Sequence, residues 1–307
     1  MKNGIIFLEQ VLKETIWGGT RLGDFGCDVS GKTVGESWCV CAHPHGDNIV
    51  LGQKKKLSEF YKSNPEFFGN IDSKEFPLLT KIIDAKTDLS IQVHPDDEYA
   101  FKNENGSIGK TECWYVLDAE PETQIVIGHN AESKDVLASM IHEEKWSELI
   151  REVPVKKGDF FFIESGTVHA IKGGTLIFET QQPCDITYRV YDYDRLSDGK
   201  KRPLHIKQCL DVIKVPFEKK EPPLNPSKTS NKNLVQKVSC PFFTVWTLDV
   251  NGEQTVVQDQ KFMIATVVEG EGSVDSFSIK KGMSFIIPFE YGRIIFNGNM
   301  QLVISAV

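Results

Sequence analysis

Short apolar runs recur along the chain, and glycine, asparagine or aspartate residues interrupt them. The runs are rich in valine, isoleucine, phenylalanine and threonine, which favour β-strands. They predict a mainly β protein, built as a sandwich or a barrel. The runs are LSIQVH (89–94), CWYVLD (113–118), TQIVIG (123–128), DFFFIE (159–164), TLIFET (175–180) and MIATVVE (263–269).

Helical periodicity is confined to three stretches, at residues 56–68, 133–150 and 205–213. The stretch 133–150 is the clearest, and we expect it to form a helical excursion with one apolar face. The residues expected near that face are Val136, Leu137, Met140, Ile141, Leu149 and Ile150.

Residues 218–233 are rich in proline, lysine, asparagine and serine, a composition typical of a linker. We therefore expect an N-terminal domain over residues 1–217 and a smaller C-terminal domain over residues 234–307. The length of 307 residues is likewise that of about two domains.

One segment occurs twice. VKKGDFFFIESGTVHAI (155–171) has a counterpart in IKKGMSFIIPFEYGRII (279–295), and Arg293 stands where the first copy has His169. The C-terminal domain is therefore expected to be a trimmed copy of the N-terminal one, without the helical excursion.

Composition and charge exclude some partners. Apolar residues make up 40% and charged residues 25% of the chain, as in ordinary globular proteins. The net charge of −8 argues against nucleic acid or an anionic membrane as a partner. No apolar run reaches the length of a membrane span, and the first twenty residues lack the apolar core of a secretion signal. The seven cysteines show no disulfide pattern. We expect a cytoplasmic protein with reduced thiols.

Four side chains predict a metal site. Gln92 and His94 alternate along a strand, so both point to the same face. Glu112 and His169 lie in two other strand-like segments that can converge there. Two imidazoles, a carboxylate and an amide oxygen suit a divalent transition metal and leave a position for water or substrate.

A second group of metal-ligand types lies in CVCAHPH (39–45). As a strand, it would place Cys39, Cys41, His43 and His45 on one face. Pro44 is expected to end the strand, and all four ligands would come from a single short segment. We therefore expect no metal site there.

The order of the four candidate ligands resembles that of the cupin superfamily, whose motifs are His-x-His…Glu and Gly-x5-Pro-x-Gly-x2-His. Gln92 replaces the first histidine and Glu164 replaces the proline. The second segment keeps that proline as Pro288, but upstream of it Met263 stands where Glu112 aligns. The resemblance implies two cupin barrels (double-stranded β-helices), the second smaller and degenerate, with a few helices on the first.

Six segments resemble type I phosphomannose isomerase, in the short bacterial form that lacks a large helical domain. The third and the last are the most specific. The segments are ETIWGGTRL (14–22), GESWCVCAHP (35–44), LSIQVHPDDEYA (89–100), GKTECWYVLD (109–118), SGTVHAI (165–171) and DITYRVYDYDR (185–195).

That family interconverts mannose 6-phosphate and fructose 6-phosphate through an enediol, a step of mannose metabolism. The reaction needs a Lewis acid at the carbonyl, a group that moves a proton, and a cationic site for phosphate. The resemblance implies one zinc ion per chain, with His94, Glu112 and His169 as ligands and Gln92 as a fourth. Similar ligand sets hold iron in other cupins, so iron stays open.

Arg189 in ITYRVYDYDR matches an active-site arginine of the family. A guanidinium is not a base at neutral pH, so we expect Arg189 to stabilise the enediolate or to orient substrate oxygens. The residues alone favour a simpler reading, a strand arginine paired with a nearby aspartate. Its candidate partners are Asp185, Asp192 and Asp194. The catalytic proton shuttle stays open between Lys110, Glu112 and metal-bound water.

The family match assigns the phosphate of the substrate to Ser90, Lys81 and Lys110. Ser90 and Lys110 each precede an expected ligand by two residues, so each shares that ligand's strand face. A small sugar phosphate is the expected partner, and the sequence carries no signal for an oligomeric state.

Two other functions stay open. One is another metal-dependent cupin enzyme, either a dioxygenase or a different sugar-phosphate isomerase. The other is a non-catalytic sugar-binding cupin. A phosphate pocket argues against the dioxygenase. In a storage-type protein with two cupin domains, both domains would lack the metal ligands. Here only the C-terminal copy has lost its candidate ligands.

Overall fold

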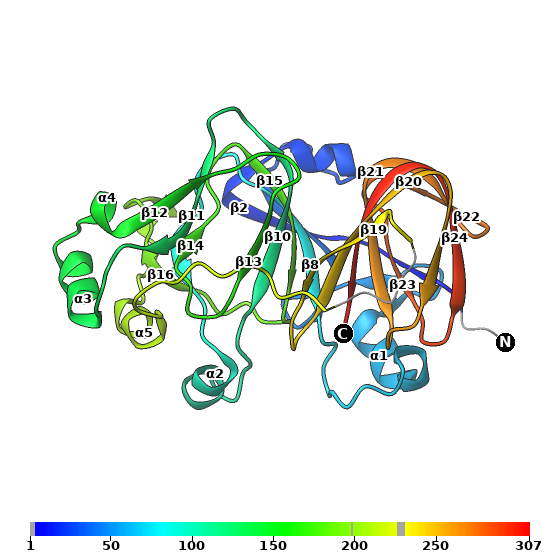
Figure 1. Ribbon diagram of the computed structural model, residues 1–307, viewed down its shortest axis with the longest axis horizontal. Coiled ribbons are helices and arrows are strands. Elements are labelled where there is room, and N and C mark those ends of the chain that lie inside the picture. The colour runs from blue at the N-terminus through cyan, green and yellow to red at the C-terminus, as the bar shows by residue number, and fades with distance from the viewer. Residues whose placement is uncertain (1–3, 198, 226–230) are drawn as a thin grey trace.

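The computed structural model describes residues 4–197, 199–225 and 231–307, and the chain is mainly β over these ranges. Figure 1 shows two β-rich halves side by side, one mostly green and the other mostly yellow to red, with blue and cyan segments from the start of the chain in the second. Three sheets of nine, six and five strands build them. The expectation of a mainly β fold is confirmed.

Two sheets form the N-terminal half, with strand orders β13-β10-β15-β8-β3-β2 and β12-β11-β14-β9-β16. The six-stranded sheet contains β2 (Val11–Gly19), β3 (Val34–Val40), β8 (Leu79–Asp84), β10 (Glu112–Ala119), β13 (Phe160–Ile163) and β15 (Thr175–Gln181). The five-stranded sheet contains β9 (Ile91–Val93), β11 (Gln124–His129), β12 (Ile150–Pro154), β14 (His169–Ala170) and β16 (Tyr188–Tyr191).

The nine-stranded sheet combines the C-terminal half with three strands from the start of the chain. Ile6 pairs with Ile286, so β1 lies beside β23. The C-terminal strands are β19 (Leu234–Ser239), β20 (Thr244–Gln258), β21 (Met263–Val274), β22 (Phe277–Lys280), β23 (Ser284–Ile287) and β24 (Gly292–Ala306). The three from the start of the chain are β1 (Ile6–Leu8), β6 (Ile49–Val50) and β7 (Lys55–Lys56).

A division of the chain at a linker over residues 218–233 stays a prediction. Residues 226–230 of that stretch lie outside the described ranges. Because β1, β6 and β7 pair into the C-terminal sheet, the beginning of the chain contributes strands to both halves.

The helices are short and lie at the edges of the sheets (Figure 1). Those in the described ranges are α1 (Leu57–Ser63), α2 (Asp97–Asn103), α3 (Lys134–His142), α4 (Trp146–Leu149) and α5 (Ile206–Val212), with 3-10 turns η1 (Arg21–Phe25) and η2 (Pro65–Phe68). Two strand pairs complete the structure: β4 (Ala42–His43) with β5 (Gly46–Asp47), and β17 (Leu196–Ser197) with β18 (Lys200–Lys201). Within these ranges every helix falls short of the length and apolar character needed to cross a membrane.

The helical excursion at 133–150 is confirmed but is broken into α3 and α4. Glu144 between them has a positive φ of 55°, which an α-helix does not accommodate. Leu137 and Ile141 are buried as expected, whereas the prediction is wrong for Val136, which is 44% exposed. Helix α2 was not predicted, although the Asp96 carboxylate caps it by accepting a hydrogen bond from the N–H of Tyr99 at 2.8 Å.

The two repeated segments occupy equivalent places in the two halves. Gly158 and Gly282 both adopt positive φ, at 89° and 91°, the left-handed region that glycine enters most easily. The N–H of Gly158 donates to the carbonyl of Val116 at 2.9 Å, and that of Gly282 donates to Val267 at 2.8 Å. The turn before β13 is therefore built like the turn before β23.

Strand registers extend this equivalence and show how the two interiors differ. Three buried charged positions of the N-terminal half correspond to apolar side chains in the core of the C-terminal half. The corresponding pairs are Lys81 and Trp246, Glu112 and Met263, and Glu179 and Ile304.

The halves share one hydrophobic core, which contains residues from both. Phe68 and Phe262 meet in it with ring centroids 5.3 Å apart. At the junction, Thr180 and Ser305 occupy equivalent register positions, and their hydroxyl oxygens lie 2.8 Å apart in a hydrogen bond. The two halves are therefore joined through both apolar and polar contacts.

We expect Met263→Glu to lower the free energy of unfolding by about 3 kcal/mol or more, because a buried carboxylate would have no cationic partner. Met263 is 2% exposed. Met263→Leu conserves volume and should cost less than about 1.5 kcal/mol. Urea unfolding followed by circular dichroism measures both. Equal urea concentrations at the unfolding midpoint for the two variants would show that this position is not in an apolar core.

Candidate active site and metal centre

The four predicted ligands come together where the two sheets of the N-terminal half meet. Gln92 lies in β9, and His94 directly follows that strand. His169 of β14 is paired opposite Gln92 on one side, and Arg189 of β16 is paired opposite it on the other. Glu112 begins β10 of the six-stranded sheet. Antiparallel pairing thus gathers residues that are far apart in the sequence.

His94, Glu112 and His169 have the spacing of metal ligands. The two histidine Nε2 atoms are 3.2 Å apart, and Glu112 oxygens lie 3.5 Å from His94 Nε2 and 3.4 Å from His169 Nε2. Ligand atoms placed tetrahedrally at usual zinc distances are about 3.3 Å apart. All three side chains are buried. The set therefore fits a small divalent metal ion.

Backbone carbonyls hold both imidazoles in the tautomer that binds a metal. The Nδ1 of His94 lies 2.8 Å from the carbonyl oxygen of Ile186, and that of His169 lies 2.8 Å from the carbonyl oxygen of Thr167. Each Nδ1 thus carries the proton, which leaves a lone pair on each Nε2. Burial lowers the pKa of both histidines, so both remain neutral near pH 7.

The Glu112 carboxylate is ionised and lacks part of its hydrogen bonding. Burial by itself would raise the pKa of Glu112, but the surrounding positive charge, that of Lys110 first, outweighs burial and brings the pKa below its usual range. Lys110 Nζ lies 2.9 Å from Glu112 Oε2 as an ion pair. That oxygen is nevertheless buried without hydrogen-bond geometry to any described residue. A buried anionic oxygen in this state favours a bound cation.

Gln92 is close to the set but presents its amide nitrogen. Its Nε2 lies 3.3 Å from His169 Nε2, while its Oε1 accepts a hydrogen bond from the Ser90 hydroxyl at 3.3 Å. A half-turn of the amide would exchange the two atoms and turn the oxygen toward the metal set.

Two lysines are buried beside the metal set, among three glutamates. Lys81 Nζ lies 3.1 Å from Glu179 and 3.5 Å from Glu36, and Lys110 Nζ lies 3.9 Å from Glu179. Burial by itself would lower the pKa of Lys81, but Glu179 and Glu36 outweigh it and raise the pKa above its usual range. Burial and the Glu112 carboxylate raise the pKa of Glu179.

Glu36 and Glu179 were missed by the analysis of the sequence. Each has a tryptophan partner: Trp38 Nε1 donates to Glu36 at 2.6 Å, and Trp114 Nε1 donates to Glu179 at 2.9 Å. The available signal was a glutamate inside an apolar run, such as Glu179 in TLIFET. The run predicts that this residue is buried, and a buried carboxylate requires a charged or hydrogen-bonding partner.

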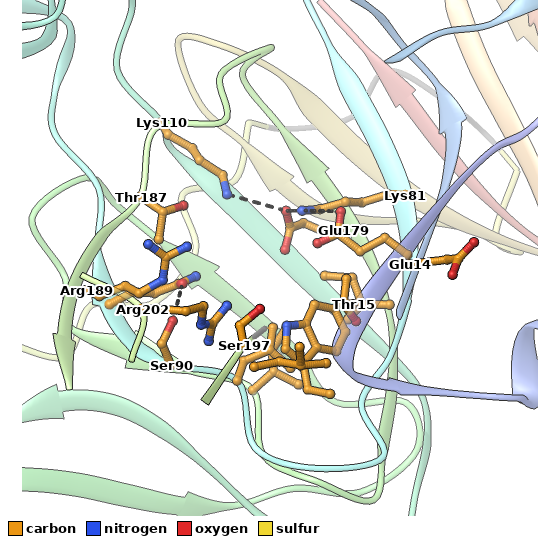
Figure 2. A pocket seen from close by; sticks show the side chains of 17 residues that line it. Glu14, Thr15, Lys81, Ser90, Lys110, Glu179, Thr187, Arg189, Ser197 and Arg202 are labelled. Carbon is orange, nitrogen blue, oxygen red and sulfur yellow. Dashed lines mark hydrogen bonds and ion pairs between the residues drawn. The ribbon is translucent and has the colours of Figure 1, made fainter. Parts of the chain in front are cut away.

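A cavity of about 330 Å³ opens beside the buried ligands. Gln92 and Lys110 line it, and residues 14–17 contribute to its wall. Figure 2 shows Arg189, Arg202 and Ser90 gathered at one end and Lys81 and Glu179 at the other. The volume lies within the range of small-molecule sites.

The simpler reading of Arg189, an ion pair with a nearby aspartate, is not borne out in the described residues. Asp192 binds Arg195 and Arg202 instead, at 2.6 Å each. The Nε of Arg189 is buried without a hydrogen-bond partner, and burial and the charge of Arg202 lower the pKa of Arg189. The other two candidates, Asp185 and Asp194, pair with histidines and with Lys201.

The CVCAHPH segment does not assemble its four candidate ligands. Among described residues, His43 and His45 instead form a group with Asp185, with ligand atoms within 4.8 Å of one another. His43 Nδ1 accepts a hydrogen bond from the N–H of His45 at 3.2 Å. The imidazole proton therefore lies on Nε2, the atom that faces Asp185. We assign no metal here.

Comparison with known proteins shows which family the chain belongs to. Residues 5–130 match the family model for the phosphomannose isomerase type I catalytic domain, and residues 233–307 match that for the mannose-6-phosphate isomerase cupin domain. Over 308 residues the chain is 42% identical to the mannose-6-phosphate isomerase ManA of Bacillus subtilis, with 98% of each chain covered. The chain belongs to the type I phosphomannose isomerase family.

Other relatives of this family agree in length and fold. The mannose-6-phosphate isomerase of Streptococcus mutans is 42% identical, with 98% of this chain and 97% of that one covered. A crystal structure of the mannose 6-phosphate isomerase from Bacillus subtilis superposes with a TM-score of 0.94 over 99% of this chain and 100% of that one. A mannose 6-phosphate isomerase bound with zinc and yttrium shares the fold, with a TM-score of 0.80 at 17% identity, over 99% of each chain.

We expect the purified protein to bind one divalent metal ion per chain. The variant His169→Ala should lose at least about 90% of the bound metal, because a site with so few protein ligands cannot bind the ion tightly after losing one of them. Inductively coupled plasma mass spectrometry measures the content. The double variant His43→Ala/His45→Ala is the matched control and should keep the metal. If the control variant lost its metal while His169→Ala kept it, the metal would lie instead at the cluster of His43, His45 and Asp185.

Proposed function

We propose that the chain is a zinc-dependent mannose-6-phosphate isomerase that interconverts mannose 6-phosphate and fructose 6-phosphate through an enediol. The observation that carries the proposal is the buried set of His94, Glu112 and His169 beside a cavity lined by Arg189 and Lys110. Relatives of nearly full length that are named mannose-6-phosphate isomerase support it.

His94, Glu112 and His169 would hold the metal, with Gln92 as a fourth ligand after the half-turn of its amide. When bound, zinc supplies a Lewis acid that polarises the sugar carbonyl and acidifies the adjacent C–H. The donor set also suits iron, so metal analysis decides between the two.

Lys110, in its ion pair with Glu112, is our candidate for moving the proton between C1 and C2. Their charged groups are 2.9 Å apart, a distance over which a proton can pass. Lys110 lines the cavity and therefore reaches the substrate. Its own ion pair with Glu112 keeps it beside the reacting end of the sugar.

Arg189 is proposed to stabilise the enediolate. Its guanidinium has no carboxylate partner among the described residues, so its charge is free to act on substrate oxygens. The phosphate is proposed to bind near Ser90, Lys81 and Lys110, all of which line the cavity.

The C-terminal half is proposed to be a second, smaller cupin barrel without a metal site. The register equivalents of Glu112, Glu179 and Lys81 are apolar there and are buried in its core. Its role would be to pack against the N-terminal half through the shared core.

We expect the zinc-loaded protein to convert mannose 6-phosphate to fructose 6-phosphate, because the site unites a metal set with an anion-binding wall. Chelation should abolish turnover, and added zinc should restore it. A coupled assay for fructose 6-phosphate measures the rate. Absence of product at full zinc occupancy would leave another metal cupin or a sugar-binding protein as the function.

Arg189→Ala should keep its metal and lose about 100- to 1,000-fold in kcat, since removing one oxyanion-stabilising donor has this cost. Metal content and kcat are measured on the same sample. Lys201→Ala serves as control, because Lys201 is exposed and pairs with Asp194. Wild-type kcat in Arg189→Ala would remove this residue from the mechanism.

A further inference from the structure

The charged end of the Arg189 side chain is not fixed by a partner of opposite charge. Arg189 lines the cavity (Figure 2). Its Nε is buried without a hydrogen-bond partner, and its guanidinium has no carboxylate partner among the described residues. A long side chain with a free charged end takes its position from the point where its main chain is held. The bonds of the Arg189 backbone therefore contribute to where the guanidinium lies.

The sheet holds Arg189 from one side only. Strand β16 is at the edge of the five-stranded sheet, and β9 is its one neighbour in the described part of that sheet. Arg189 is paired opposite Gln92, and the register shifts directly afterwards, between Arg189 and Tyr191. The N–H and C=O groups on the outer side of an edge strand need partners from outside the sheet.

His205 is the partner of both backbone groups of Arg189. The N–H of Arg189 donates to Nδ1 of His205 at 3.1 Å. The N–H of His205 donates in turn to the carbonyl oxygen of Arg189 at 2.9 Å. His205 directly precedes α5, which packs against β16. One residue thus provides both the donor and the acceptor that a further strand would provide.

The bond to Nδ1 of His205 exists only while the imidazole is neutral. A backbone N–H is always a donor, so Nδ1 is the acceptor, and the proton of the neutral ring lies on Nε2. Protonation of the ring would place a second N–H at Nδ1, facing the N–H of Arg189. Two donors do not form a hydrogen bond, so this contact would be lost. The bond to the Arg189 carbonyl oxygen would remain, because it comes from the main chain of His205.

The groups around His205 keep it neutral near pH 7. Burial and the positive charge of Arg189 lower the pKa of His205, and the carboxylate of Glu104 at the end of α2 acts against them. The hydroxyl of Tyr188 donates a hydrogen bond to Glu104 at 2.7 Å, and the Tyr188 ring lies 6.0 Å from the imidazole, centroid to centroid. Because its pKa is lowered, His205 takes up a proton only in more acidic solution.

We propose that His205 is a positioning residue for Arg189. Its neutral imidazole fixes the backbone from which the Arg189 side chain reaches into the cavity, and its protonation releases that backbone. The inference rests on the proposed function, because it assumes that Arg189 acts on the substrate there. It adds to that function a residue that does not line the cavity and a loss of activity in acid that the metal ligands do not cause.

Two substitutions separate this contact from the rest of the fold. In His205→Asn the amide oxygen stands two bonds from Cβ, as Nδ1 does, so it accepts the same hydrogen bond but does not titrate. In His205→Ala the acceptor is lost, while the backbone N–H that bonds Arg189 remains. His129 provides the matched control, because its Nδ1 accepts a hydrogen bond from the N–H of Ala131 at 3.2 Å and it does not line the cavity.

The first test compares these variants as zinc-loaded proteins near neutral pH. We expect His205→Ala to lower kcat for mannose 6-phosphate about 10-fold, since a displaced catalytic group costs up to about 100-fold. His205→Asn and His129→Ala should stay within about threefold of wild type, because the first keeps the acceptor and the second loses a bond away from the cavity. Wild-type kcat in His205→Ala, an equal loss in His129→Ala, or a His205→Asn variant as slow as His205→Ala overturns the inference.

The second test is the pH dependence of kcat in the wild type and in His205→Asn. Titration of the metal ligands affects both proteins alike, so the ratio of the two kcat values reports on His205 alone. The ratio of wild type to variant should fall about 10-fold as the pH is lowered through the pKa of His205. A ratio that stays constant from about pH 8 to about pH 5, the range in which histidines titrate, contradicts the inference.

A measurement without turnover separates this inference from the proposed function. In protein that carries isotope-labelled arginine, the amide resonance of Arg189 should shift with protonation of His205, and His205→Asn should abolish this shift. If the wild type shows the shift but no turnover of mannose 6-phosphate, the isomerase proposal fails and the contact stands. If the wild type turns over and the Arg189 amide does not titrate with His205, the isomerase proposal stands and His205 does not position Arg189.

Discussion

The Glu112 carboxylate is the group on which the rest of the site depends. It is buried where the six-stranded sheet approaches the five-stranded one, and it lies within 3.5 Å of His94, His169 and Lys110. A buried carboxylate is stable only with charged or hydrogen-bonding partners around it. Lys110 supplies part of this compensation, and Glu112 Oε2 still lacks a hydrogen bond among described residues. The fold therefore presents an anionic position that favours a cation, between histidines that backbone carbonyls have already oriented.

The C-terminal half shows what the same strand registers form without that carboxylate. Met263 takes the position of Glu112, Ile304 that of Glu179, and Trp246 that of Lys81. The charged network and the apolar core are two self-consistent ways to fill one arrangement of strands. A single carboxylate or lysine would be unstable in the apolar version, so the charged members are present together or absent together.

The cavity separates two kinds of electrostatics. At the metal end, lysines and glutamates are interleaved, so that each charged group has a neighbour of opposite charge. At the other end, arginines outnumber aspartates, and a guanidinium keeps its charge at any pH the enzyme meets. The same asymmetry explains how a chain of net charge −8 can hold an anion.

The sequence by itself determined the strand content, the repeated turn at Gly158 and Gly282, and the three ligand types at positions 94, 112 and 169. These follow from local alternation and from the spacing of residue types, which short stretches of chain encode. It also predicted the helical excursion, although not the break at Glu144. The tertiary structure alone decided which charges are neutralised. Arg189 stands among candidate aspartates in the sequence, yet in the fold Asp192 turns to Arg195 and Arg202. Glu36 and Glu179 reach the lysines only because β3, β8, β10 and β15 lie side by side. Ion pairing depends on distances across strands, and those distances are set by sheet order, which nearby residues in the sequence do not specify.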